Sequence, residues 1–334
     1  MKHTAKITAV LLGMFLITQL IGLYVVNYYT QGAISFDGEK VNVTSPELPY
    51  GLESPELETS TDFNQVFVSI VIAFIIAISL LLFLMHFKAE VFLRLWFFLV
   101  VVIAISIALN AIIPAFKYSS LLALAIALLL AYFKLFKRYI LVHNLTELII
   151  YPGIAAVFVP ILNFFTIVLL LIIISVYDMW AVWHSGIMQK MAKYQMNQLK
   201  LFSGFFVPYL SSKQRAQVKA IKQKTSAKNL EKKKIKVNVA ILGGGDVIFP
   251  IIAAGVMLKT FGFVSIAGIN IPLASLLVIL GAAFGLGYLF MSAEKKKFYP
   301  AMPFISAGIF LGMALSWIIY TQILDIAVTL WPLF

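Results

Sequence analysis

The sequence predicts an all-α polytopic membrane protein with nine transmembrane helices, an N-terminus in the cytoplasm and a C-terminus outside. Three observations support this prediction. Hydrophobic residues make up 62% of the 334 residues, which is more than a soluble core of this size can bury. The hydrophobic residues fall into runs about as long as a bilayer is thick. Lysine and arginine collect in alternate loops, as in proteins that follow the positive-inside rule.

Each apolar run is close to the length of about 20 residues that a helix needs to cross a membrane. The runs cover residues 7–27, 64–85, 91–114, 119–133, 139–159, 161–185, 238–258, 266–291 and 301–330. The fourth run is short, and the ninth is long enough to tilt. The first run is too long for the apolar region of a cleaved signal peptide, so we expect it to remain as a helix.

Charged residues predict the topology and divide the chain into three parts. The first loop, residues 28–63, holds half of the acidic residues. The turns after the even-numbered runs are basic, with Lys88 and Arg94, then Lys134, Lys137 and Arg138, then a loop over 186–237, then Lys295, Lys296 and Lys297. We therefore expect a six-helix part over 1–185, a basic cytoplasmic loop over 186–237 and a three-helix part over 238–334.

The composition excludes several kinds of chemistry. There is no cysteine, so disulfides and thiolate ligands are excluded. The histidines are scattered without metal-ligand spacing, at His3, His86, His143 and His184. We therefore expect neither a metal nor a cofactor. The net charge of +12 follows the loops, so we expect a lipid bilayer and no nucleic acid as its partner.

Two aspartates, Asp178 and Asp246, lie inside the sixth and seventh runs. A carboxyl at membrane depth costs several kcal/mol unless it is satisfied, so such residues usually have a function. At a rise of about 1.5 Å per residue, both aspartates lie about 10–12 Å from the cytoplasmic end of their helices. Consecutive helices run antiparallel and are usually neighbours, so the two carboxyls can face each other at one level. Two close carboxyls tend to share a proton; one can then accept a proton from water while the other donates to a carbonyl oxygen.

Glycines and prolines flank these aspartates in two motifs. Gly243, Gly244 and Gly245 precede Asp246; they allow unusual backbone angles or a close approach by another segment, and a helix-packing surface is the alternative. Pro250 should loosen the same helix. The ninth run opens with Pro300, Ala301, Met302 and Pro303, which predict an extended segment beside a peptide-binding cleft or, alternatively, an ordinary helix start.

Other residues have weaker signals. Phe205, Phe206, Val207 and Pro208 form an apolar stretch in the basic loop, either an interfacial segment or a short strand able to pair with an extended peptide. For Glu147 we expect a polar network with His143 and Asn144 rather than catalysis, and for Asp325 we also expect a packing or hydrogen-bonding role. Gly281 and Gly285 have the spacing of a helix-contact motif.

Together these motifs resemble those of the presenilin and signal-peptide-peptidase family of intramembrane aspartyl proteases. That family has Tyr-Asp in the sixth span, Gly-x-Gly-Asp in the seventh and Pro-Ala-Leu at the start of the ninth. The corresponding residues here are Tyr177-Asp178, Gly243–Asp246 and Pro300–Met302. Met302 replaces leucine, a near-isosteric change. The order and span numbers match over nearly the whole chain, and the compact loops are most similar to those of archaeal homologues.

The resemblance implies that Asp178 and Asp246 are the catalytic pair. It also implies that Tyr177, Gly243–Gly245 and Pro300–Pro303 shape the active site and that Phe205–Pro208 help to hold an unwound substrate. The implied activity is endoproteolysis of transmembrane segments, in signal-peptide remnants or single-span proteins, without metal or cofactor. The implied location is a membrane, the plasma membrane in a prokaryote, and self-association into a homo-oligomer stays open.

Two other functions fit parts of the sequence. An ion- or proton-coupled transporter also uses paired acids near broken helices, but the first half has no counterpart of the glycine run. A prepilin-type peptidase also uses a Gly-x-Gly-Asp motif. That alternative leaves Asp178 at the end of the sixth run and the Pro-Ala-Met opening of the ninth run unexplained.

Overall fold

The structure is a computed structural model that describes residues 5–30, 35–36, 39–40, 46–52, 55, 57, 59–87, 89–137, 139–185, 203–209, 238–266, 268–293 and 299–323. Within these ranges, nine helices are long and apolar enough to cross a membrane, so the predicted all-α, nine-helix fold class is confirmed, while the orientation of the two termini stays a prediction. Most of the basic loop over 186–237, the lysines at 295–297 and Asp325 lie outside the described residues.

The nine helices follow the nine predicted runs in order. They are α1 (Ala5–Thr30), α2 (Ser60–His86), α3 (Glu90–Ile112), α4 (Ser119–Tyr132), α5 (Ile140–Phe158), α6 (Phe164–Trp180), α10 (Gly244–Phe261), α11 (Leu273–Ser292) and α12 (Met302–Ile318). A π-helical turn extends three of them, α4 by η3 (Phe133–Lys137), α6 by η4 (Ala181–Ser185) and α12 by η6 (Ile319–Ile323). The short fourth run is therefore long enough to span once η3 is included.

Side chains define where two of the helices begin. Thr59 and Asp62 form a capping box at the start of α2, and Asn163 and Thr166 form one at the start of α6. In each box the side chains accept hydrogen bonds from backbone amides that have no partner inside the helix. The second of these caps fixes the residue at which α6, the helix that carries Asp178, begins.

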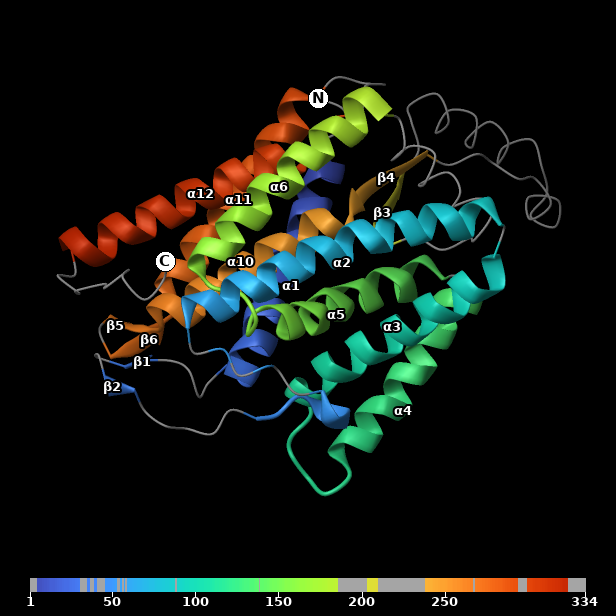
Figure 1. Cartoon of the computed structure of the whole chain (residues 1–334), viewed down its shortest axis with the longest axis horizontal. Helices are drawn as coiled ribbons and strands as arrows, with labels where there is room; N and C mark the ends of the chain where they lie inside the picture. Colours follow the sequence, from blue (N-terminus) through green and yellow to red (C-terminus); the bar gives the residue numbers. More distant parts are fainter. Residues whose placement is uncertain are drawn as a thin grey trace, which may run out of the picture.

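Within the part of the chain that the structure describes, three two-stranded antiparallel sheets accompany the helices. They pair β1 (Ser35–Phe36) with β2 (Glu39–Lys40), β3 (Gly204–Tyr209) with β4 (Asn238–Gly243), and β5 (Val264–Ile266) with β6 (Ile269–Ile271). In Figure 1, β3 and β4 lie at one end of the bundle, and the other two sheets lie at the opposite end. A short 3₁₀ turn, η2 (Pro49–Gly51), lies in the first loop.

Two predicted helix starts were wrong because strands precede the helices. The seventh span begins at Gly244 rather than at residue 238, and the eighth begins at Leu273 rather than at residue 266. The residues before them form β4 and the β5–β6 hairpin. A short apolar strand and a helical turn have the same hydropathy, so the apolar runs extended across both.

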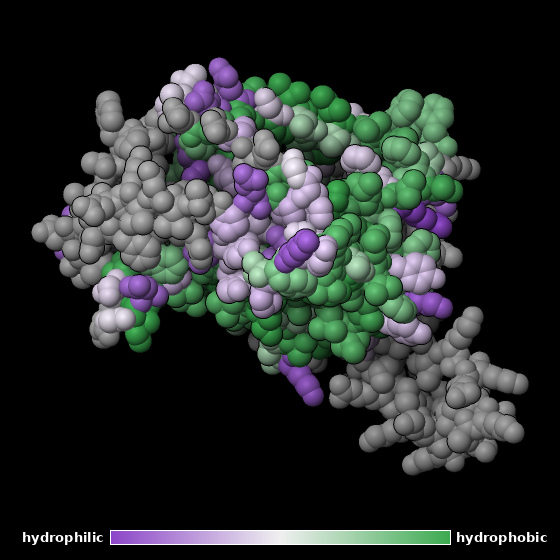
Figure 2. Space-filling view, turned by 90° about the horizontal axis from the view of Figure 1, so that it is seen from below, coloured by the Kyte–Doolittle hydropathy of each residue, from purple (hydrophilic) through white to green (hydrophobic). Residues whose placement is uncertain are grey.

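The centre of the bundle is α10, the most deeply buried of the nine helices. It packs against α1, α5, α6, α11 and α12. By contrast, Phe67 is the only residue of α2 that is buried, so α2 lies at the periphery. Among the coloured residues of Figure 2, hydrophobic ones form broad areas beside a smaller polar area, as expected for a protein in contact with lipid.

Four glycines bring α11 and α12 into backbone contact. A Cβ atom added to Gly281 would collide with the carbonyl group of Gly308, and one added to Gly308 would collide with the carbonyl group of Gly281. Gly285 and Gly312 face backbone of the opposite helix in the same way. The predicted helix contact at Gly281 and Gly285 is therefore confirmed, and α12 supplies the matching glycines.

Candidate active site

Asp178 lies two residues before the end of α6, and its carboxylate faces the start of α12. Oδ2 accepts a hydrogen bond of 3.0 Å from the backbone amide of Met302, and the amide of Ala301 also donates to this carboxylate. Only 8% of Asp178 is exposed. Backbone amides at a helix N-terminus have no partner within the helix and attract negative charge. The start of α12 therefore satisfies a carboxylate that would otherwise be costly to bury.

The predicted Pro-Ala-Met-Pro motif forms this helix start. Ala301 is the N-cap residue, Met302 is the first residue of α12, and Pro303 follows within the first turn. Proline is accepted there because first-turn amides have no carbonyl partner. The prediction of an ordinary helix start is therefore confirmed, with Ala301 in a helical conformation and the amides of the motif donating to Asp178; a peptide-binding cleft beside the motif stays a prediction.

Asp246 lies in the first turn of α10, directly after β4. The sequence placed it two turns inside a helix; instead, a strand leads to Gly243, which is the N-cap residue. The amide of Gly243 donates to the Asp246 carboxylate. The carbonyl group of Asp246 has no intrahelical donor at Pro250, which carries no N–H, yet α10 continues unbroken through Pro250.

The two carboxylates lie close enough for their charges to interact. They come from neighbouring helices, since α6 packs against α10 and α12 packs against both. Ser175 of α6 and Ser306 of α12 add a buried hydrogen bond of 2.9 Å one turn from Asp178. Helix packing and hydrogen bonds thus bring the predicted aspartate pair together.

The three glycines before Asp246 have different surroundings. None has a positive φ angle, so the expected unusual backbone angles are not used. A Cβ atom on Gly244 would lie 2.6 Å from Ser203 Oγ and 2.8 Å from Tyr151 Oη, whereas one on Gly245 would lie 3.8 Å from its nearest neighbour, in Phe249. The close approach that the sequence predicted therefore occurs at Gly244.

We expect Gly244→Ala to lower the free energy of unfolding by about 1–3 kcal/mol, because the buried Tyr151 has to move. Gly245→Ala is the matched control in the next position, and there we expect no loss or a gain of about 0.5 kcal/mol from reduced backbone freedom. Thermal unfolding of both variants in the same detergent compares them. Equal destabilisation by the two substitutions would contradict the assigned contact.

Phe205, Phe206, Val207 and Pro208 belong to β3, so the strand prediction is confirmed. Phe205 is fully buried and its ring packs edge-on against Tyr151. Whether this segment binds substrate stays a prediction. The remaining predicted residue, Tyr177, packs edge-on against Phe74 of α2, with ring centroids 5.7 Å apart.

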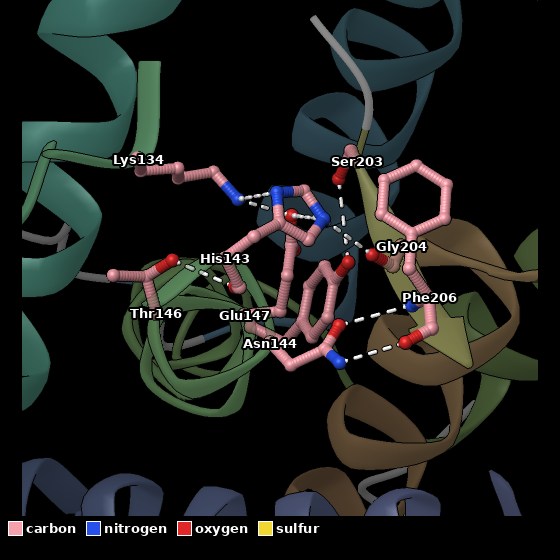
Figure 3. A network of polar contacts seen from close by, with 9 residues as sticks. Lys134, His143, Asn144, Thr146, Glu147, Ser203, Gly204 and Phe206 are labelled. Atoms are coloured by element: carbon pink, nitrogen blue, oxygen red, sulfur yellow. Dashed lines mark hydrogen bonds and ion pairs between the residues drawn. The ribbon is translucent and has the colours of Figure 1, made fainter. Parts of the chain in front are cut away.

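A buried polar network connects α4 and α5 to β3 (Figure 3). Lys134 of η3 forms an ion pair with Glu147, and the side chains are only 2% and 0% exposed. Lys134 Nζ also donates to His143 Nδ1 at 3.3 Å, and His143 Nε2 donates to the Gly204 carbonyl at 2.8 Å. The predicted network of Glu147 with His143 is confirmed, whereas Asn144 bonds to Phe206 instead. Lys134 was missed because it was counted among the lysines of a cytoplasmic turn.

Two further residues near the site were missed. The side-chain amide of Gln19 in α1 donates at 2.9 Å to the carbonyl of Val247, the residue that follows Asp246. The hydroxyl oxygen of Tyr151 lies 3.4 Å from Ser203 Oγ. Of these two residues, only Gln19 could have been found from the sequence, because a side-chain amide inside an apolar run needs a hydrogen-bond partner.

The sequence model of the "signal-peptide peptidase, presenilin aspartyl protease" family matches residues 42–322. This chain belongs to that family. Two solved structures of a presenilin family intramembrane aspartate protease, in space groups C222 and P2, have the same fold. The C222 structure has a TM-score of 0.51 and 17% sequence identity, and the P2 structure has a TM-score of 0.53 and 16% identity. Each alignment covers 91% of this chain, together with 94% of the C222 chain and 95% of the P2 chain. No curated protein matches by sequence.

The protein is therefore a multi-pass integral membrane aspartyl protease, as the motifs predicted. A presenilin-family match over most of the chain does not favour the transporter or the prepilin-type alternative. Within the described residues, no group of three or more histidine, cysteine, aspartate or glutamate side chains could hold a metal ion. The described site thus offers two carboxylates, backbone amides and a strand edge for its chemistry.

Proposed function

We propose that Asp178 and Asp246 are the catalytic pair of this protease and that they hydrolyse peptide bonds within transmembrane helices. The observation that carries the proposal is the convergence of two carboxylates from adjacent helices, whose charges interact within a buried bundle. One carboxylate takes a proton from water, and the other, protonated, donates to the carbonyl oxygen of the scissile bond. Both groups come from one chain, so the mechanism needs no second copy.

We place the pair in the cytoplasmic half of the membrane, because the positive-inside pattern puts the end of α6 and the start of α10 on that side. A substrate helix has to unwind there, since an intact helix keeps its peptide bonds inside its own hydrogen-bonded turns. Small or helix-weakening residues in the substrate should therefore favour cleavage.

We further propose that the unwound substrate pairs with the outer edge of β4. In an antiparallel pair, alternate residues turn their backbone groups toward and away from the partner strand. The amide of Gly244 donates to the carbonyl of Ser203, the residue just before β3, and this bond continues the register of the β3–β4 pair. Even-numbered residues of β4 therefore turn their backbone groups toward β3, and odd-numbered residues turn theirs away. Among the described residues, nothing binds the outward groups of Val239 and Ile241. This edge leads directly to Asp246.

The test uses a synthetic single-span peptide in liposomes with the purified protein. We expect cleavage inside the apolar segment, and in H₂¹⁸O the new carboxyl terminus should carry the heavy isotope. N-methylation of successive substrate amides removes one hydrogen bond at a time, and we expect about five- to tenfold slower cleavage at every second position. Cleavage that is equally sensitive at all positions would contradict strand pairing, and cleavage outside the apolar segment would contradict the proposed substrate.

A further inference from the structure

The outer edge of β3 is covered by a helix side chain that bonds as a strand would. Asn144 of α5 donates from Nδ2 to the Phe206 carbonyl at 2.8 Å, and its Oδ1 accepts from the Phe206 amide at 2.9 Å. A neighbouring strand would make this same pair of hydrogen bonds with one residue. Figure 3 shows the Asn144 amide facing the backbone of Phe206 with both bonds marked.

His143 covers the next outward position of the same edge. Its Nε2 donates to the carbonyl group of Gly204, and its ring packs at 4.8 Å from the ring of Phe206. Lys134 donates to the opposite ring nitrogen, which fixes the tautomer that has its proton on Nε2. The ion pair between Lys134 and Glu147 anchors this arrangement inside the bundle.

Pro208 closes the last outward position. The residues of β3 that turn away from β4 are the even-numbered ones, Gly204, Phe206 and Pro208, because Ser203 pairs with Gly244 across the sheet. Proline has no N–H, so it cannot donate to an added strand. Of the two strands, β3 therefore has an outward edge where Phe206 is fully bonded, the Gly204 carbonyl is bonded and Pro208 lacks a donor, whereas β4 has outward groups that no described residue binds.

We propose that Asn144 and His143 are positioning residues that close the edge of β3, so that an extended substrate adds to β4 in one register beside Asp246. This inference rests on the proposed function, and it names the residues of α5 that direct the substrate to one edge. An extended peptide can pair with either free edge of a two-stranded sheet. Pairing with β3 would hold the peptide one strand spacing, about 4.8 Å, further from Asp246 than pairing with β4 does.

The experiment compares Asn144→Ala and Asn144→Asp with the wild-type protein on the single-span peptide. Alanine removes both hydrogen bonds, and aspartate keeps the shape but replaces the donor to the Phe206 carbonyl by an acceptor. For both variants we expect KM to rise about tenfold with kcat changed less than about twofold. By mass spectrometry we expect new products cut one or two residues from the main site.

Asn110→Ala is the matched control. The side-chain amide of Asn110 also makes two hydrogen bonds, to Tyr29 and Ser120, but at the other end of the bundle. We expect this variant to keep the wild-type KM and a single cleavage site even if its thermal midpoint falls. A purely structural role for Asn144 would lower the midpoint and the amount of active enzyme without shifting the cleavage site.

Four outcomes separate this inference from the function on which it rests. A raised KM with displaced cuts in both Asn144 variants supports it. Wild-type KM and a single cut in those variants overturn it, as does loss of folded protein in both. If variants that lack Asp178 or Asp246 cleave at the wild-type rate, the catalytic assignment itself is overturned. The reason for directing a substrate to β4 is then lost as well.

Discussion

Replacement of either Asp178 or Asp246 by asparagine is expected to lower kcat by at least about 10³-fold, with the protein still folded. Asparagine has the same shape as aspartate but can neither accept a proton from water nor donate an acidic proton to a carbonyl oxygen. General acid–base catalysis by one positioned group contributes about 10²–10⁴-fold to a rate, and here each carboxyl serves the same proton transfer. The double variant should be no slower than the singles, since groups that act as a unit are non-additive.

Cleavage of the single-span peptide by the purified variants measures this effect. Asp62→Asn is the matched control, because Asp62 caps the start of α2 in the same chain and lies far from Asp178 in sequence. We expect that variant to cleave at close to the wild-type rate. Retained cleavage in both active-site variants, with the protein folded, would rule out the assigned pair.

Breaking the buried ion pair between Lys134 and Glu147 is expected to have the largest effect on stability. Lys134→Met leaves the Glu147 carboxylate without its cation, and Glu147→Leu leaves the ammonium without its anion, in a site where both side chains are almost fully buried. Removing one partner of a buried pair costs about 3–5 kcal/mol. The double variant Lys134→Met/Glu147→Leu should be more stable than either single variant, because no charge is then left alone.

A double-mutant cycle on the free energy of unfolding in mixed micelles measures this coupling. The partly exposed pair of Glu90 and Arg94, with 3.5 Å between its charged atoms, is the comparison within the same chain. We expect Glu90→Gln to cost less than about 1 kcal/mol. If Lys134→Met costs no more than Glu90→Gln, the buried pair does not stabilise the fold as argued.

The sequence predicted the aspartate pair and the spans well, because their signals are independent of tertiary contacts. A carboxyl inside an apolar run and a run of about 20 apolar residues are visible in any single segment. The strands before α10 and α11 were not predicted. Residues 238–243 read as helix on hydropathy alone, and the paired segment 204–209 lies 29 residues upstream of that strand in the chain, so only the folded protein reveals the sheet.

Lys134 shows a second limit of prediction from sequence. Its neighbours Lys137 and Arg138 are typical of a cytoplasmic turn, so all three residues were assigned to topology. The structure buries Lys134 against a glutamate thirteen residues later. The informative signal was Glu147 itself, since an acid in an apolar helix needs a cation or hydrogen-bond donors nearby.

The glycine contact between α11 and α12 has a mechanical consequence. With backbone against backbone at Gly281 and Gly308, no compressible side chain separates these helices, and they move as one rod. Asp178 is fastened to the end of that rod through Met302, whereas Asp246 belongs to α10. The separation of the two carboxylates therefore depends on how α10 packs against α6 and against the paired helices α11 and α12.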